Sequence, residues 1–135
     1  MLIPNINEMN SNAVTVGLID DDELYICILT TLLELEGMKV LFQAFNGKTG
    51  IAELGVIKPK VLIVDIEMPV MDGYEVIDFV KKTWPDIMII AHSSLTDIKA
   101  QQKAIDCGAG AFITKSGALT NLIGTILTLT KNFEQ

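Results

Sequence analysis

The sequence predicts an α/β fold, a doubly wound five-stranded parallel sheet with helices on both faces. Two observations predict it. Five short apolar runs alternate with helical patterns along the chain, and the runs lack the apolar–polar alternation that marks a sheet with one face in water. Strands that are covered on both faces and joined by right-handed crossovers give a (βα)5 arrangement. A chain of 135 residues has room for one such domain.

The expected elements follow one another in a regular order. The expected strands are the apolar runs at residues 14–19, 40–44, 61–64, 87–91 and 111–114. The expected helices cover residues 22–36, 48–56, 74–83, 97–107 and 116–131. The first helix is predicted from apolar side chains that recur at helical spacing, namely Leu24, Ile28, Leu32 and Leu35.

Residues that favour turns separate these elements. Gly37 stands where the first helix should end, and Asp72-Gly73 marks a turn before the third helix. Pro85 ends that helix, because the residue before a proline avoids the α region. Residues 1–12 are polar and rich in asparagine, so we expect a flexible tail there and a single domain over residues 13–135.

Charge and composition disfavour several classes of function. The formal net charge is −7, and all ten basic residues are lysines. An acidic chain without arginine is a poor binder of nucleic acid and favours cationic partners such as Mg²⁺. The longest uncharged run, residues 116–130, is shorter than the roughly 20 apolar residues of a membrane span.

The cysteines and the first residues indicate a compartment. Cys27 and Cys107 are too few for a disulfide framework, and we expect both to be buried free thiols. The first residues lack the basic and apolar regions of a signal peptide. We therefore expect a cytoplasmic location.

Charged or hydroxyl-bearing side chains follow four of the five expected strands. They are Asp20, Asp21 and Asp22 after the first strand, Asp65 after the third, His92, Ser93 and Ser94 after the fourth, and Lys115 after the fifth. In a doubly wound sheet the ligand site lies at the carboxyl ends of the strands, so these side chains should meet at one edge. Crowded carboxylates raise one another's pKa unless a cation lies among them, and their oxygens suit Mg²⁺. With a lysine and a hydroxyl beside them, they suit phosphoryl transfer, in which positioning and charge neutralisation dominate.

These residues lie in segments that resemble a known family. The motifs are IDDDE at 19–23, VLIVDIEMPVMDGYE at 61–75, IIAHSS at 89–94 and GAGAFITK at 108–115. Over residues 14–131 the chain is similar to the receiver domain of response regulators, the phosphoacceptor of two-component signalling, which has a flavodoxin-like fold.

The resemblance implies a role for each matching residue. Asp65 would be the phosphorylated aspartate. The Mg²⁺ ligands would be the side chains of Asp20, Asp21 and Asp65 and the backbone carbonyl of Glu67. Ser93 and Lys115 would contact the phosphoryl group, and Ser93 and Phe112 would act as the switch.

The resemblance also implies partners. The phosphodonor would be a histidine kinase or a histidine phosphotransfer protein. The output would be a protein surface formed by the expected elements at 97–107, 111–114 and 116–131, to which a downstream effector or a second copy would bind. Apolar side chains of the last helix exceed the stripe that a docked helix needs, so some should stay exposed, among Leu119, Leu122, Ile123, Ile126, Leu127 and Leu129. No direct contact with nucleic acid or membrane is expected.

Some residues depart from the family pattern. Ser116 follows Lys115 where most receivers have a proline in a cis bond. Glu67 is acidic and Leu95 is apolar, from which we predict slow loss of the phosphoryl group. The chain would therefore be no enzyme beyond its own phosphorylation and slow dephosphorylation.

Two alternatives stay open. One is an interaction module that works without phosphorylation. The other is a phosphatase with an aspartate nucleophile, prompted by Asp65-Ile66-Glu67. Haloacid-dehalogenase-type phosphatases carry a second aspartate where this chain has Glu67, which disfavours the phosphatase.

Overall fold

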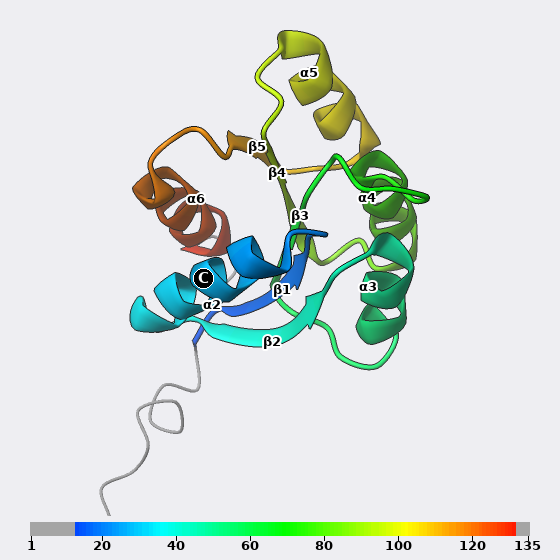
Figure 1. Cartoon of the computed structure of the whole chain (residues 1–135). Helices are drawn as coiled ribbons and strands as arrows, with labels where there is room; N and C mark the ends of the chain where they lie inside the picture. Colours follow the sequence, from blue (N-terminus) through cyan, green and yellow to red (C-terminus); the bar gives the residue numbers. More distant parts are fainter. Residues whose placement is uncertain (1–12, 132–135) are drawn as a thin grey trace, which may run out of the picture.

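A five-stranded parallel sheet lies between two layers of helices in the computed structural model, which describes residues 13–131 (Figure 1). The strands are β1 (Thr15–Ile19), β2 (Lys39–Ala44), β3 (Val61–Val64), β4 (Met88–Ser93) and β5 (Ala111–Thr114). Their order in the sheet is β2-β1-β3-β4-β5, and every neighbouring pair is parallel. The predicted doubly wound fold is confirmed.

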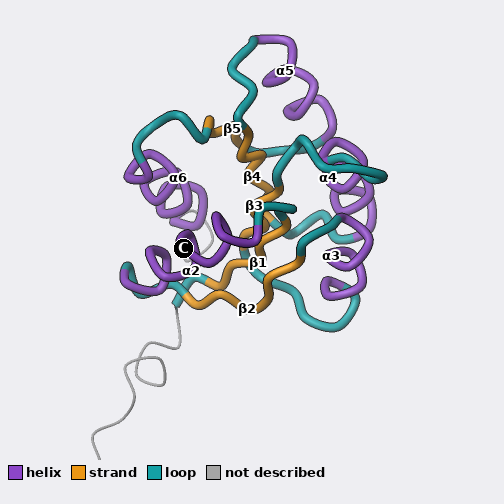
Figure 2. The backbone as a smooth tube through the Cα atoms, in the orientation of Figure 1, coloured by secondary structure: helices purple, strands orange, loops and turns teal. Residues whose placement is uncertain are grey.

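Five helices cover the sheet. They are α2 (Glu23–Leu35), α3 (Gly47–Leu54), α4 (Gly73–Thr83), α5 (Ile98–Cys107) and α6 (Leu119–Lys131). Helices α2 and α6 lie on one face, and α3, α4 and α5 lie on the other (Figures 1 and 2). No helix within residues 13–131 is long and apolar enough to cross a membrane.

The central strand β3 shows why the apolar runs lack polar alternation. All four of its residues are buried. Val61 and Ile63 pack into the core under α2 and α6, and Leu62 and Val64 pack into the core on the opposite face. Burial of one such side chain contributes roughly 1.5–3 kcal/mol, so a strand covered on both faces gains from every position.

Polar residues cap four helices, and Gly37 ends the first of them as expected. Asp22, Asn46, Asp72 and Asp97 are N-caps, and the side chain of each accepts a hydrogen bond from the backbone N–H three residues later. Gly37 has a φ of 84° just beyond α2, a conformation that glycine adopts without steric penalty.

The buried face of α2 differs from the expected one. The predicted stripe is largely exposed, with Leu24 at 72% and Leu35 at 76% exposed. The side chains that face the sheet are Ile26, Leu29 and Leu33. The helix is apolar on most sides, so two rows of side chains satisfy helical spacing, and only packing against the sheet selects one of them.

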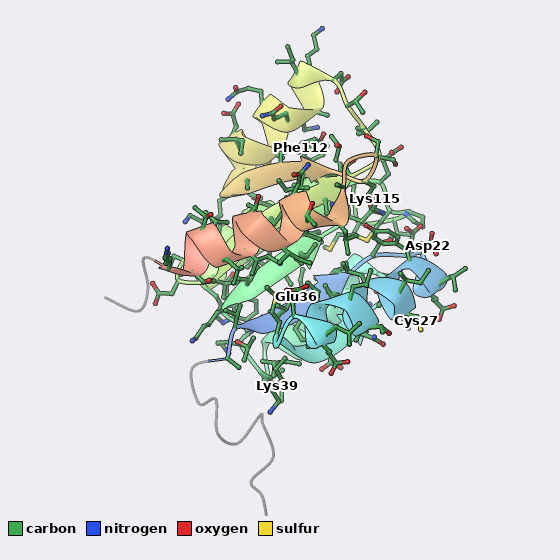
Figure 3. The ribbon with its side chains drawn as sticks, turned by 90° about the vertical axis from the view of Figure 1, so that its left-hand side faces the viewer. Asp22, Cys27, Glu36, Lys39, Phe112 and Lys115 are labelled. Carbon is green, nitrogen blue, oxygen red and sulfur yellow. The ribbon has the colours of Figure 1, made fainter. Side chains whose placement is uncertain are left out.

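The cysteine prediction is wrong for Cys27. This residue lies on the exposed side of α2, one position beyond the buried Ile26, whereas Cys107 is half-buried (Figure 3). The expected tail at residues 1–12 lies outside the described part of the chain.

Several element boundaries differ from expectation, and two of them lie next to the expected site residues. His92 and Ser93 belong to β4 itself, because they still pair with Ile113 and Thr114 of β5. Helix α6 begins at Leu119 instead of residue 116, since the Gly117 N–H first turns back to the Thr114 carbonyl.

The loop between β3 and α4 contains a strained residue. Val70 has a φ of 70° and is the one non-glycine residue with positive φ among residues 13–131. A β-branched side chain is rare in this left-handed region. Val70 is fully exposed, so no packing offsets the strain.

We expect Val70→Asn to raise the free energy of unfolding by about 1 kcal/mol, because asparagine tolerates the left-handed region. This corresponds to a rise in Tm of roughly 4 °C. Thermal unfolding followed by circular dichroism measures it. The matched control is Val56→Asn, which changes a valine that is also 86% exposed but lacks a positive φ. An equal gain in both variants would contradict the strain.

Candidate functional site

Three carboxylates and one ammonium group meet at the carboxyl edge of the sheet. Asp20 and Asp21 follow β1, and Asp65 follows β3. Strands β1 and β3 are neighbours with Ile19 opposite Val64, so Asp20 and Asp65 leave the sheet side by side. Lys115 follows the edge strand β5 and extends toward the start of α2, where Asp22 lies (Figure 3).

Asp20 is the most fully bonded of the carboxylates. Its Oδ2 accepts a hydrogen bond from Lys115 Nζ at 2.7 Å, and its Oδ1 accepts one from the Asp22 backbone N–H at 2.9 Å. Both oxygens are therefore engaged, and Asp20 anchors the lysine.

Asp65 is buried and incompletely paired. Its Oδ1 lies 3.5 Å from Lys115 Nζ, an ion pair without a hydrogen bond. Within residues 13–131, this is the one buried side-chain oxygen or nitrogen that has no hydrogen-bond partner. A buried carboxylate oxygen without a hydrogen bond destabilises the fold. This oxygen is therefore a candidate to bind a ligand.

The surroundings raise the pKa of Asp65 to about 7. Burial is the largest cause, followed by the negative charge of Asp20, and together they outweigh the opposing charge of Lys115. Burial acts against the charged form of Lys115, but its hydrogen bond to Asp20 and the charge of Asp65 raise its pKa nonetheless. Lys115 therefore stays protonated, and one lysine does not neutralise the pocket.

The carboxylates can hold a hard divalent cation. One oxygen each from Asp20, Asp21 and Asp65 lies within 4.8 Å of the others, and Asp21 is exposed at the mouth of the pocket. The unpaired Oδ1 of Asp65 is a free donor of the kind that Mg²⁺ prefers. The donor set thus fits such an ion.

The backbone of the site depends on a glycine. Gly73 opens α4, and its N–H donates to the Ile66 carbonyl at 2.9 Å. A Cβ at this position would lie 2.3 Å from the Asp65 backbone oxygen. Only glycine lets the first turn of α4 pack directly on the segment that carries Asp65.

Glu67, two residues after Asp65, contacts the segment that follows β4. The side chain of Glu67 is exposed and accepts a hydrogen bond from Ser94 Oγ at 3.2 Å. Ser93 is completely buried, and its Oγ accepts from the Leu95 N–H at 3.0 Å. In this structure, the Ser93 hydroxyl therefore bonds the local backbone. The sequence indicated no bond between Glu67 and Ser94.

Phe112 belongs to the edge strand β5. It is half-buried in β5 and packs against the core on the side of α4 and α5. The Lys115–Ser116 peptide is not cis, as no cis peptide occurs within residues 13–131.

Tyr25 and His92 are polar residues near the pocket whose contacts sequence analysis missed. The Tyr25 hydroxyl lies 2.5 Å from His92 Nε2, and Lys115 Nζ lies 4.8 Å from the centre of the Tyr25 ring. No pattern joins two residues 67 positions apart, so no signal in one sequence could have indicated the pair.

Comparisons with known proteins agree with one another. A family model described as "Response regulator receiver domain" matches residues 16–127. The DNA-binding transcriptional activator EvgA of Escherichia coli (strain K12) is 27% identical over 109 residues, 81% of this chain and 53% of its own length. A protein-glutamate methylesterase/protein-glutamine glutaminase of Clostridium acetobutylicum is 37% identical over 106 residues, 76% of this chain and 30% of its own length. This chain thus spans about half or less of these two relatives.

A solved structure shares the fold. The receiver domain protein of Methanospirillum hungatei JF-1 superposes with a TM-score of 0.83 at 22% identity, covering 90% of this chain and 97% of that chain. At this identity the likeness concerns the fold alone.

We expect the raised pKa of Asp65 to make stability depend on pH when no divalent cation is present. The folded state holds a proton up to about pH 7 that the unfolded chain releases near pH 4, so stability falls as pH rises between these values. Asp65→Asn removes this loss. Its gain in Tm over wild type should be several degrees at pH 8 and should shrink toward pH 4, measured by thermal unfolding in EDTA. A gain that is equal at both pH values would contradict the raised pKa.

Proposed function

The chain belongs to the response regulator receiver domain family, and from this premise we propose that Asp65 accepts a phosphoryl group from a phosphohistidine donor, with Mg²⁺ bound beside it. The observation that carries the proposal is the buried Asp65 oxygen without a hydrogen-bond partner, set among two other carboxylates and a lysine. This arrangement offers a nucleophile, a place for a metal ion and a fixed positive charge.

Each residue has a distinct task in the transfer. A carboxylate oxygen of Asp65 attacks phosphorus, the P–N bond to the donor imidazole breaks, and the imidazole leaves with the bonding electrons. Bound Mg²⁺ would supply positive charge for the phosphoryl oxygens, held by Asp20, Asp21, Asp65 and the Glu67 backbone carbonyl. Lys115, 3.5 Å from Asp65, adds a second positive charge. Asp20 keeps that lysine in place through its 2.7 Å hydrogen bond.

The exposed side chains of α2 support docking of a protein donor beside the pocket. Helix α2 begins at Glu23, directly after the acidic residues. Leu24 and Ile28 on this helix are 72% and 49% exposed. An exposed apolar patch marks a protein contact, and a histidine kinase or phosphotransfer protein that reaches Asp65 must cover this edge. We propose that this exchange takes place in the cytoplasm, with a histidine kinase or a histidine phosphotransfer protein as the partner.

The proposed output surface consists of α5, β5 and α6. The phosphoryl group draws the Ser93 hydroxyl from the Leu95 N–H, the loop after β4 follows, and Phe112 turns inward. Both arrangements must already be close in energy, because a ligand only shifts a population. Leu127 of α6 is 50% exposed, and a groove of about 540 Å³ runs along Ile113 and α6. These features support binding of a downstream protein or a second copy.

We expect acetyl phosphate with Mg²⁺ to add one phosphoryl group to the chain, as an acid-labile acyl phosphate on Asp65. Intact-mass spectrometry detects the addition, and EDTA should abolish it. The control variant Asp72→Asn changes an aspartate whose side chain caps α4 and should still be modified. Modification of Asp65→Asn at the wild-type rate would overturn the proposal.

We expect the acyl phosphate to be long-lived, because Glu67 repels hydroxide-like water and Leu95 cannot orient it. A hydrogen bond from Ser94 Oγ holds the Glu67 carboxylate. Glu67→Ala and Leu95→Gln should each shorten the lifetime severalfold, followed by loss of the phosphorylated mass after removal of the donor. If both variants keep the phosphoryl group longer than wild type, the explanation is wrong.

A further inference from the structure

A chain of polar contacts runs from the edge strand of the sheet to the lysine of the site. His92 in β4 is 3% exposed, and its Nδ1 lies 2.8 Å from the Ile113 carbonyl oxygen of β5. Its other nitrogen, Nε2, lies 2.5 Å from the hydroxyl of Tyr25, in the first turn of α2. Both ring nitrogens of a buried histidine are therefore engaged.

The partners determine where the protons lie. A carbonyl oxygen only accepts, so His92 Nδ1 carries the hydrogen and donates it to Ile113. In the neutral ring Nε2 is then an acceptor, and the Tyr25 hydroxyl donates to it. Burial lowers the pKa of His92, in keeping with a neutral ring. The contacts thus hold the Tyr25 side chain in one orientation.

The Tyr25 ring in turn packs against the ammonium group of Lys115. Lys115 Nζ lies 4.8 Å from the ring centre, within the range in which a ring face attracts a cation. The same ammonium bonds Asp20 at 2.7 Å and lies 3.5 Å from Asp65. An aromatic face and two carboxylates therefore surround it. A lysine side chain has many rotamers, and each contact removes some of them.

We propose that Tyr25 and His92 are positioning residues for Lys115: the imidazole orients the phenol ring, and the ring holds the ammonium within reach of Asp65. The proposal rests on the proposed function, in which that ammonium contacts the phosphoryl group. The proposal also assigns a role to His92, the single histidine of the sequence.

The placement of the lysine is tested without a phosphodonor. In wild type, the ε-methylene proton signals of Lys115 should be shifted upfield by the Tyr25 ring, and Tyr25→Leu should remove the shift. His92→Leu should reduce it, and His92→Gln, which keeps an acceptor near the Nε2 position, should restore part of it. If His92→Leu leaves the Lys115 signals unchanged, the proposal is overturned, whatever phosphorylation shows.

The single histidine gives a second direct signal. Nitrogen shifts of the His92 ring should show hydrogen on Nδ1 in wild type, and Tyr25→Phe should move the Nε2 shift because its donor is lost. An unchanged Nε2 shift would exclude the hydrogen bond and with it the proposal. Thermal unfolding of each variant confirms that it remains folded.

The consequence for the reaction is measured with acetyl phosphate and Mg²⁺. Tyr25→Phe should slow phosphorylation about fivefold, the size expected for one lost hydrogen bond, and Tyr25→Leu more. The matched control is Tyr74→Phe, because Tyr74 also donates a hydrogen bond, to the Ala100 carbonyl, and carries a lysine, Lys103, at 4.3 Å from its ring. That control should react at the wild-type rate.

A double-mutant cycle separates positioning from a general effect on the fold. If Tyr25 acts through Lys115, then Tyr25→Phe should cause no further loss in a Lys115→Ala background. A full fivefold loss in that background would overturn the proposal. Wild type that takes up no phosphoryl group would instead refute the proposed function, while the Lys115 and His92 signals still decide whether the pair positions the lysine.

Discussion

The burial of the Asp65 carboxylate beside Asp20 is the constraint on which the site depends. Two carboxylates at neighbouring strand ends repel each other, and burial makes the repulsion stronger. Lys115 offsets this repulsion only in part. One oxygen of Asp65 has no hydrogen-bond partner. The pocket is therefore held in a state that an added positive charge would stabilise, which is what a site for a metal ion and a phosphoryl group requires.

The rest of the fold sustains this unfavourable arrangement. The core strand β3 is apolar on both faces, and its burial offsets the cost of the carboxylate that follows it. Gly73 lets α4 pack on the backbone of Asp65 and so supports the segment that carries the carboxylate. Val70, in the same loop, holds a strained conformation on an exposed turn. Strain of this kind concentrates at functional loops.

Lys115 links the pocket to more distant parts of the molecule. It follows the edge strand β5, bonds an aspartate after β1 and lies over a tyrosine of α2. Tyr25 in turn bonds His92, and His92 bonds the Ile113 carbonyl oxygen of β5. A change in the charge of Asp65 therefore acts on a group that is held by several elements of the fold, and β5 belongs to the surface that we propose as the output.

Local pattern determined much of this protein. The apolar run at Val61–Val64, the turn at Asp72-Gly73 and the glycine at Gly37 identified the elements, because strand burial and turns depend on neighbours in the chain. The convergence of Asp20, Asp65 and Lys115 followed from topology alone, since parallel strands end at one edge.

Tertiary packing decided the rest. Helix α2 offers two apolar rows, and only the sheet selects Ile26 over Leu24. The hydrogen bond of Ser93 to local backbone, the bond between Glu67 and Ser94, and the Tyr25–His92 pair each depend on distances of a few ångströms. A hydrogen bond requires that precision, and a periodic pattern of residue types in the sequence does not contain it.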